Sequence, residues 1–499
     1  MPATVQITRF VWIVAAGLCA LTSSEDGDAA EPRRNILFIA VDDLRPELGC
    51  YGSPMVKSPN IDRLAASGLQ FNRAYCQFAL CNPSRASLLS GRRPETIQVF
   101  TLARFVRDGN PDVVTLPQFF KERGYESRSY GKIFHAGNGN HDDPISWTVP
   151  PWRNANDDEP SDTAPQAAPK KSKKKKASPA EPAPDPHANE KPYSAPDAGD
   201  EALVDGQIAT KAIQALSELR DKPFFLGVGF IRPHLPFVAP KKYWDIYDPS
   251  RLRLASNPFL PKGAPAFASN DSSELRRYLD VPKEGPISDS EALKLIQGYF
   301  ACVSYVDAQV GRVLAELDRL GLRENTIVIL WGDHGYQLGE HGTWTKRTNW
   351  EIATRVPMIL SVPGMKPGSK TDALVEFVDI YPTLVELCGF PMPAGLEGTS
   401  MVPLLKDPDR HWKTAAFSFY TNATTEMGRT NGRAMRTERY RLVEWSGTTA
   451  TNLVYELYDH ETDPDENVNL AVLPEHRTLV ERLKKQLQVG WQGARVAAN

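Results

Sequence analysis

Three short, uninterrupted apolar runs constrain the fold of this chain more than any other feature. Their sequences are NILFIAV at residues 35–41, PFFLGVGF at residues 223–230 and TIVILW at residues 326–331. Such runs are typical of central parallel strands that are covered on both faces. Polar residues follow each run, and in open α/β sheets ligands bind at the edge where the carboxyl ends of the strands meet. The sequence therefore predicts a site built at strand ends.

Helical patterns between these runs complete an α/β architecture. Apolar residues recur at helical spacing over residues 303–317, and Gly321 stands where a C-terminal cap belongs. The alternation of buried strands with amphipathic helices predicts a three-layer α/β/α sandwich. After about residue 403 the sequence changes to short β-like pieces and a terminal helix. We therefore expect a main domain over residues 31–402 and a smaller C-terminal α+β subdomain over residues 403–499.

Two segments fall outside this pattern. Arg9 precedes an apolar run at residues 10–21 that is too short to span a bilayer, and polar residues follow it. This predicts a signal peptide over residues 1–30, no stable membrane span, and a secreted or periplasmic protein. Residues 151–200 are rich in Pro, Ala, Asp and Lys. They predict a disordered low-complexity insertion, in which a lysine run at 173–176 is either a solvated loop or a tether for anionic glycans.

Charge and cysteine content narrow the class of protein. The chain has 58 Lys and Arg against 61 Asp and Glu, a net charge of -3, which argues against a general nucleic-acid binder. Of six cysteines, Cys19 lies in the expected signal peptide. Five remain, so an exported protein would keep at least one unpaired sulfur. Cys81 is the cysteine with a chemical context.

The segment Cys81-Asn82-Pro83-Ser84-Arg85 carries the sharpest chemical signal. Pro83 suits the first turn of a helix, which places Cys81 at a helix N-terminus. Backbone N–H groups and the helix dipole favour an anion there, and Arg85 adds a forked donor for a tetrahedral oxyanion. The residues alone indicate a nucleophile or ligand beside an anion site.

Two pairs of polar residues end the first and third apolar runs. Asp42-Asp43 follows residue 41, and Asp333-His334 follows Gly332. Adjacent carboxylates repel one another unless a cation lies between them, and hard oxygen ligands suit Ca²⁺ or Mg²⁺. Soft ligands for zinc are lacking around these pairs. Together they predict one site for a divalent cation.

Further lysines and histidines occur in short polar motifs. Lys132 and His135 lie three residues apart in GKIFH, His234 follows the second apolar run in RPHLPF, and Lys346 closes GYQLGEHGTWTK. A single residue of this kind is more often a surface or core residue than a ligand. Four in such motifs are candidates for holding an anionic group.

The motifs resemble those of the type I sulfatase family. C-x-P-S-R followed by Ser90-Gly91-Arg92 is similar to its signature. G-K-x-x-H, x-P-H-x-P-F and D-H-G-x-x-L-G-E-H-G-x-W-x-K resemble iduronate-2-sulfatase and its bacterial relatives over most of residues 35–400. The resemblance implies an alkaline-phosphatase-like fold with residues 31–402 as the catalytic domain. The implied activity is hydrolysis of sulfate esters on carbohydrate, either a 2-O-sulfated uronic acid or a related sulfated polysaccharide. Tyr336 departs from the family's usual Trp, at a place where glycan recognition is expected.

The resemblance also implies roles for individual residues. A separate maturation enzyme would oxidise Cys81 to formylglycine, whose hydrate attacks the sulfur. One Ca²⁺ would be bound by the two polar pairs and by residue 81: Asp42, Asp43, Cys81, Asp333 and His334. Charge on the sulfate oxygens would be stabilised by three cations: Arg85, Lys132 and Lys346. His234 would protonate the leaving alcohol, and His135 would assist the hydrate hydroxyl.

Two alternative functions remain open at this stage. A phosphatase, phosphodiesterase or phosphonate hydrolase of the alkaline-phosphatase superfamily would keep the fold, but those enzymes generally use Thr or Ser with two metal ions. A non-catalytic protein that binds sulfated glycans would keep the site with Cys81 unconverted. Comparing turnover of an aryl sulfate with that of an aryl phosphate distinguishes a sulfatase from the first alternative. Binding of a sulfated glycan without release of sulfate would indicate the second.

Overall fold

The computed structural model describes residues 1–2, 33–138, 140–154, 187–425, 427–449 and 452–495. The described residues from Arg33 onward form one compact unit. Almost all of the expected signal peptide at residues 1–30 lies outside the described residues. Within the described ranges, no helix is long and apolar enough to cross a membrane.

The main sheet has eight strands in the order β10-β2-β8-β7-β1-β5-β3, with β9 beside β2. The strands are β1 Asn35–Val41, β2 Leu69–Tyr75, β3 Glu126–Gly131, β5 Phe224–Phe230, β7 Thr326–Gly332, β8 Arg355–Ser361, β9 Ser369–Thr371 and β10 Val375–Glu376. The three apolar runs form the central parallel neighbours β5, β1 and β7, as predicted. The sheet as a whole is mixed, because β8 runs antiparallel to both β7 and β2.

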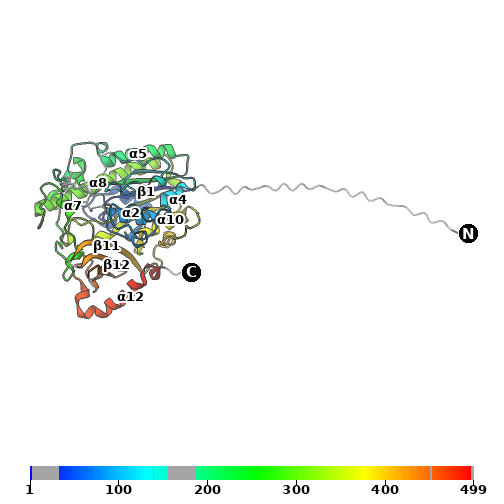
Figure 1. Ribbon diagram of the computed structural model, residues 1–499. Coiled ribbons are helices and arrows are strands. Elements are labelled where there is room, and N and C mark those ends of the chain that lie inside the picture. The colour runs from blue at the N-terminus through cyan, green and yellow to red at the C-terminus, as the bar shows by residue number, and fades with distance from the viewer. Residues whose placement is uncertain (3–32, 139, 155–186, 426, 450–451, 496–499) are drawn as a thin grey trace, which may run out of the picture. The chain divides into compact units, whose positions relative to one another are not determined.

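The side chains of β1 explain why helices cover both faces of this sheet (Figure 1). Leu37, Ile39 and Val41 pack on one side against α1 (Pro59–Ala66), α5 (Val204–Leu219) and α8 (Asp289–Arg319). Ile36, Phe38 and Ala40 pack on the other side against α2 (Cys81–Ser90), α4 (Leu116–Lys121) and α10 (Ile380–Leu387). Successive strand residues point to opposite faces, so an uninterrupted apolar strand needs both layers. The predicted three-layer sandwich is confirmed.

The boundaries expected for the insertion at residues 151–200 are wrong at both ends. Residues 155–186 lie outside the described residues. Before them, Trp152 forms a parallel bridge with Tyr130. After them, β4 (Tyr193–Ser194) pairs with β6 (Phe237–Val238), and η3 starts at Asp200. Backbone pairing to distant strands orders these flanks, and composition alone does not reveal such pairing.

Short helices connect the main layers and position several loops. They are α3 Pro94–Ile97, α6 Lys241–Trp244, α7 Ser273–Arg276, α9 Glu351–Thr354 and α11 Val402–Lys406. The expected domain boundary after residue 402 falls inside α11, and the second sheet begins only at Ala415. All five cysteines in the described residues are free thiols.

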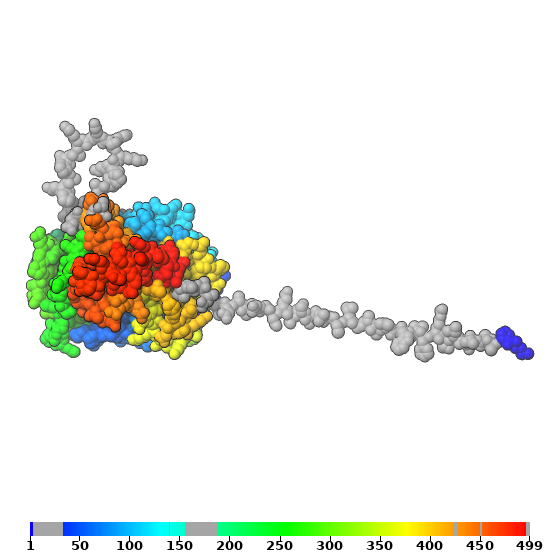
Figure 2. All heavy atoms as spheres, turned by 90° about the horizontal axis from the view of Figure 1, so that it is seen from below, coloured from blue at the N-terminus to red at the C-terminus, as the bar shows by residue number. Residues whose placement is uncertain are grey.

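The C-terminal residues form a four-stranded antiparallel sheet. Its strands are β11 Ala415–Thr425, β12 Gly428–Thr437, β13 Tyr440–Gly447 and β14 Val454–Asp459. One face packs against α12 (Arg477–Ala494), which lies across the orange strands in Figure 2 as the red segment. The opposite face, with Trp445 and Tyr458, belongs to the same buried cluster as Cys81. The small sheet therefore forms part of the surroundings of the predicted nucleophile.

Candidate active site

The predicted site forms at the carboxyl ends of β1 and β7. These strands pair in register, with Val41 opposite Gly332, so the two polar pairs that follow them emerge side by side. The backbone N–H of Asp43 donates to Oδ1 of Asp333 over 3.0 Å. Asp43 adopts a positive φ of 57°, which turns its carboxylate away from the strand direction. Adjacent strands thus account for the gathering of these residues.

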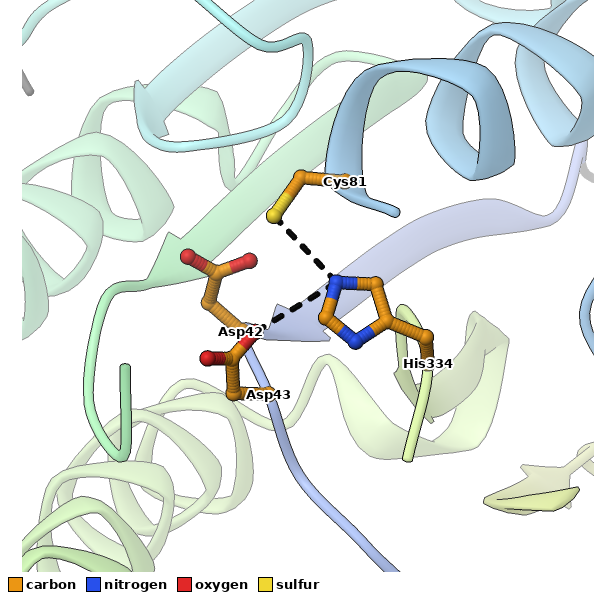
Figure 3. Close-up of side chains that lie close together, drawn as sticks. All are labelled: Asp42, Asp43, Cys81 and His334. Atoms are coloured by element: carbon orange, nitrogen blue, oxygen red, sulfur yellow. Dashed lines mark hydrogen bonds and ion pairs between the residues drawn. The ribbon is translucent and has the colours of Figure 1, made fainter. Parts of the chain in front are cut away.

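Cys81 enters the site from the N-terminus of α2 (Figure 3). Its Sγ lies 3.2 Å from Nε2 of His334. Nδ1 of His334 lies 2.9 Å from the Gly335 carbonyl, which places the ring proton on Nδ1 and leaves the Nε2 lone pair facing the site. Ser84 anchors the helix to β7, because its hydroxyl donates to the carbonyl of Asp333 over 2.6 Å.

The cluster fits a divalent cation. Ligand atoms of Asp42, Asp43, Cys81 and His334 all lie within 4.8 Å of one another, and all four residues are buried. Oδ1 of Asp43 accepts no hydrogen bond from the described residues, although it is buried and lies 3.3 Å from Nε2 of His334. Two lone pairs that face each other in a buried place need a cation between them. Asp333 lies at the edge of the group, with Oδ1 3.7 Å from Nε2 of His334.

Arg85 holds the carboxylates in place. Its side chain is fully buried; Nε donates to Oδ2 of Asp333 over 2.8 Å and Nη2 donates to Oδ1 of Asp42 over 3.0 Å. Nη1 donates to the carbonyls of Lys132 and Ile133. These pairs let Arg85 position Asp42 and Asp333, and its expected contact with sulfate oxygens stays a prediction.

Two buried lysines bring positive charge to the cluster. Nζ of Lys132 lies 2.5 Å from Oδ2 of Asp42, and Nζ of Lys346 lies 2.9 Å from Oδ2 of Asp43. Lys132 directly follows β3, and Lys346 lies in the long loop after β7. The structure therefore brings together two segments whose order in the sequence gives no hint of contact.

Glu274 of α7 is a site residue that the sequence did not reveal. Oε1 of Glu274 accepts from Nζ of Lys346 over 2.7 Å and lies 3.1 Å from Nε2 of His234. Oε2 accepts from the hydroxyl of Thr345 over 3.1 Å. A single Glu in the segment SSELRR carries no motif. Only the folded contacts with Lys346 and His234 identify it.

Two further residues complete the comparison with the sequence predictions. His135 is buried, and its Nε2 lies 3.4 Å from Nδ2 of Asn138. Its role toward residue 81 stays a prediction. Tyr336 is buried beside the site: its ring stacks on Tyr299 with centroids 5.7 Å apart, its hydroxyl donates to the Trp344 carbonyl, and Nζ of Lys346 lies 5.9 Å from the ring centroid. Its role in glycan recognition stays a prediction.

Burial and neighbouring charges lower the pKa of Asp42 and raise the pKa values of Asp333 and Cys81. Burial alone would raise the pKa of Asp42, but Lys132 and Arg85 outweigh it and hold that pKa well below the ordinary value. The pKa of Asp333 is raised by burial and by the charge of Asp42. Burial, reinforced by Asp42, raises the pKa of the Cys81 thiol well above its ordinary value. A thiol that stays protonated at neutral pH is a weak nucleophile.

Comparison with known proteins identifies the family. A family model described as Sulfatase matches residues 34–390, and a second one, described as N-sulphoglucosamine sulphohydrolase, C-terminal, matches residues 339–492. The chain belongs to the sulfatase family. It is 38% identical to iduronate 2-sulfatase from Mus musculus over 421 residues, which cover 77% of this chain and 74% of the relative. The resemblance inferred from the motifs is confirmed.

Two solved structures share the fold of this sulfatase. The structure of BT4656 in complex with its substrate D-glucosamine-2-N,6-O-disulfate has a TM-score of 0.72 and 21% identity, and the match covers 92% of this chain and 98% of that one. Phosphonate monoester hydrolase from Silicibacter pomeroyi has a TM-score of 0.72 and 22% identity, with coverage of 93% and 96%. These matches confirm the predicted alkaline-phosphatase-like fold. The sequence relationship makes the chain a sulfuric ester hydrolase, and it favours neither of the two alternative functions.

Proposed function

We propose that this sulfatase hydrolyses the 2-O-sulfate ester of a uronic acid in a sulfated glycan, with residue 81 as formylglycine and one bound Ca²⁺. The observation that carries the proposal is the buried group of Cys81, His334, Asp42 and Asp43 at the N-terminus of α2. The relationship to iduronate 2-sulfatase, at 38% identity, supports the choice of sugar. A related sulfated polysaccharide is the second candidate substrate.

The nucleophile is residue 81 after oxidation by a separate maturation enzyme. Cys81 lies at the start of a ten-residue helix whose N–H groups and dipole favour the anionic sulfate group. Formylglycine, as its hydrate, carries two hydroxyls on one carbon, which supplies a nucleophile and a route to release sulfate as the aldehyde re-forms. A plain Ser or Cys lacks the second hydroxyl and would stall as a covalent ester.

The metal ligands are Asp42, Asp43, Asp333 and His334, together with residue 81. Bound there, Ca²⁺ would supply positive charge to the sulfate oxygens. Arg85 keeps Asp42 and Asp333 oriented through its two ion pairs. Four buried carboxylates of the site, Asp42, Asp43, Asp333 and Glu274, pair with three fully buried Arg and Lys side chains, Arg85, Lys132 and Lys346, which leaves an excess of one negative charge among these seven groups. A bound divalent cation would reverse that excess, and the singly charged sulfate ester would then balance it.

The remaining polar residues act on the sulfate group and the leaving alcohol. Lys132 and Lys346 hold sulfate oxygens and stabilise the charge that develops on them. His234 donates the proton on Nε2 to the leaving alcohol; the Leu235 carbonyl fixes Nδ1, and the carboxylate of Glu274 beside Nε2 favours the protonated ring. His135 takes up a proton from the hydroxyl of residue 81. The same proposal places the enzyme outside the cytoplasm, in the periplasm or secreted, where glycan substrates occur.

The test is sulfate release by protein co-expressed with a formylglycine-generating enzyme. The substrates are a set of glycosaminoglycan disaccharides and algal oligosaccharides, and mass spectrometry verifies residue 81. Cys81→Ala is the control that cannot be converted. We expect release from a 2-O-sulfated uronate, lost in the control and after chelation, and restored by Ca²⁺.

The outcomes separate the parts of the proposal. Release from an algal sugar alone keeps the chemistry and changes the substrate. Undiminished release after chelation contradicts the metal. The absence of release from every sulfated sugar, with formylglycine verified, contradicts the proposed function, and phosphate and phosphonate esters would then be assayed.

A further inference from the structure

A polar cavity of about 600 Å³ lies beside Glu274. It is lined by residues of the segment 266–274, of the loop at 345–347 and of β11. Its size lies in the range of small-molecule sites, about 300–1,000 Å³. Three segments distant in sequence thus form one concave surface, and the C-terminal sheet supplies one of its sides.

The cavity adjoins the catalytic group through Glu274, which contacts the proposed proton donor His234. Glu274 lines it and also contacts His234 and Lys346. Ligand atoms of Asp43, His234 and Glu274 lie within 4.8 Å of one another, so this wall reaches the predicted metal site. Under the proposed function His234 protonates the ester oxygen of the sugar, so the sugar would lie on the side of His234 and Glu274, next to this cavity.

Residues that line the cavity contact the segment that precedes Cys81. The backbone N–H of Arg347 donates to the carbonyl of Ala79 over 3.1 Å, two residues before Cys81. Phe267 and Tyr420 line the cavity and belong to the same buried cluster as Cys81. The cavity and residue 81 therefore share one packed cluster of side chains, which fixes their relative position.

The lining suits a sugar that carries a negative charge. Tyr420 and Phe267 offer aromatic surface, and the side-chain amides of Asn270 and Asn422 lie nearby; Nδ2 of Asn270 donates to the Lys346 carbonyl over 2.9 Å and Nδ2 of Asn422 to the Phe267 carbonyl over 3.2 Å. Arg347 directly follows Lys346 and is half-buried. It adopts a positive φ of 72°, a conformation that is uncommon outside glycine and tends to occur at functional sites.

The positive charge of Arg347 lowers the pKa values of two residues that line the cavity, Tyr420 and Glu274. Burial raises the pKa of Tyr420 to about 12, and Arg347 opposes that rise. Burial alone would raise the pKa of Glu274, but Lys346, His234 and, to a smaller extent, Arg347 hold it well below its ordinary value. A guanidinium in such a place is suited to bind a carboxylate through two parallel hydrogen bonds.

We propose that this cavity binds the sugar of the leaving alcohol and that Arg347 binds the carboxylate of that sugar. The proposal rests on the proposed function and deepens it: the enzyme selects a sulfated uronic acid because Arg347 pairs with its carboxylate. A neutral sulfated sugar cannot form that pair and is turned over less efficiently.

The experiment compares two substrates that differ in one group. One is a 2-O-sulfated uronate methyl glycoside, and the other is the same sugar with its carboxyl reduced to an alcohol. Wild-type enzyme, Arg347→Met and Arg347→Lys are assayed for kcat/KM on both, with residue 81 converted in all. Arg220→Met is the matched control, because Arg220 is exposed and pairs only with the exposed Asp221 among the contacts described for it.

We expect wild type to prefer the uronate by about tenfold or more, the effect of one charge-assisted hydrogen-bonded pair. Arg347→Met loses most of this preference, Arg347→Lys keeps part of it, and Arg220→Met keeps all of it. If Arg347→Met does not fold, the substrate pair on wild type and Arg347→Lys still decides.

Two results overturn the proposal in different ways. Equal activity of wild type on both sugars, or an unchanged preference in Arg347→Met, contradicts the role of Arg347 while the sulfatase function stands. Failure of matured wild type to release sulfate from either sugar contradicts the proposed substrate class and this inference together.

Discussion

Two walls of the candidate site differ in how the chain builds them. The strand-end wall consists of residues that follow β1 and β7: Asp42, Asp43, Asp333 and His334. The loop wall consists of residues from α7, the loop before α9 and β11: Glu274, Lys346, Arg347 and Tyr420. The first is positioned by neighbouring strands in one sheet. The second depends on contacts between separate segments, such as Glu274 with Lys346, 72 positions apart.

This difference suggests that the strand-end wall binds the metal and that the loop wall recognises the sugar. Strand ends in a packed sheet have little freedom, so they suit a metal site whose ligands must be held closely. Loops and a second sheet can change in sequence while the central sheet stays intact, so they suit recognition of the sugar. We therefore expect substitutions in the strand-end wall to remove activity on every sulfate ester. Substitutions in the loop wall should change activity in a way that depends on the leaving group.

The largest effect is expected for Asp43→Asn in the strand-end wall. It replaces a buried metal ligand, and we expect kcat to fall about 10³-fold or more on sugar and aryl sulfates alike. Steady-state kinetics over a range of Ca²⁺ concentrations measures this, with the exposed Asp221→Asn as the control. A loss confined to sugar sulfates would remove the distinction between the two walls.

The second-largest effect is expected in the free energy of unfolding. Arg85→Met leaves the buried carboxylates of Asp42 and Asp333 without their shared partner, at a cost of about 3–5 kcal/mol in the free energy of unfolding. Urea unfolding in the presence of chelator measures it, and added Ca²⁺ should restore part of the loss. A change below about 1 kcal/mol would show that Arg85 is not needed to compensate these charges.

A smaller effect is expected for Glu274→Gln in the loop wall. The substitution removes the negative charge that holds Lys346 and His234, so we expect kcat on a sugar sulfate to fall about 10- to 100-fold. An aryl sulfate with a good leaving group depends less on His234, and its loss should be several-fold smaller. Equal losses on both substrates would contradict a role toward the leaving alcohol. Glu218→Gln, at an exposed position, is the control.

The smallest expected effect is a pH dependence of the free energy of unfolding. It is caused by Glu456, which is buried beside Trp445 and Tyr458. Burial raises the pKa of Glu456 to about 6, against the opposing hydrogen bonds from Tyr458, Trp445 and Trp350. The folded state then binds more protons than the unfolded state between pH 4.5 and 6. The free energy of unfolding therefore falls as pH rises through this window, by about 2 kcal/mol from this group.

Glu456→Gln removes that titration. The free energy of unfolding of wild type minus that of the variant should therefore fall by about 2 kcal/mol between pH 4.5 and 6 and level off above pH 6. Urea unfolding of both proteins between pH 4 and pH 7.5 measures it. Parallel curves for the two proteins would mean that Glu456 keeps an ordinary pKa in the folded state.

The strand-end wall could be predicted well from the sequence for a physical reason. Apolar runs identify buried strands, and the residues that follow neighbouring parallel strands must share an edge of the sheet. The sequence alone therefore indicated that Asp42-Asp43 and Asp333-His334 lie together. The helix N-terminus at Cys81 followed from Pro83 in the same way. These features are local in sequence, and the fold brings them together through one sheet.

Most residues of the loop wall could not be predicted from the sequence, because they come from separate segments that only the fold brings together. Glu274 sits in a four-residue helix without a motif, and Tyr420 comes from a strand of the second sheet. Arg85 was predicted as a site residue, but sequence does not show that its guanidinium pairs with the carboxylates of Asp42 and Asp333. The sequence likewise does not show that Tyr336 stacks on Tyr299.

The most direct test of the central claim is the dependence of activity on conversion of residue 81. Preparations with different fractions of formylglycine, quantified by mass spectrometry of the peptide that contains residue 81, are assayed for sulfate release from a 2-O-sulfated uronate disaccharide. The account predicts activity proportional to the converted fraction and a line through zero. Activity that is independent of that fraction, or that persists in Cys81→Ala, would contradict it.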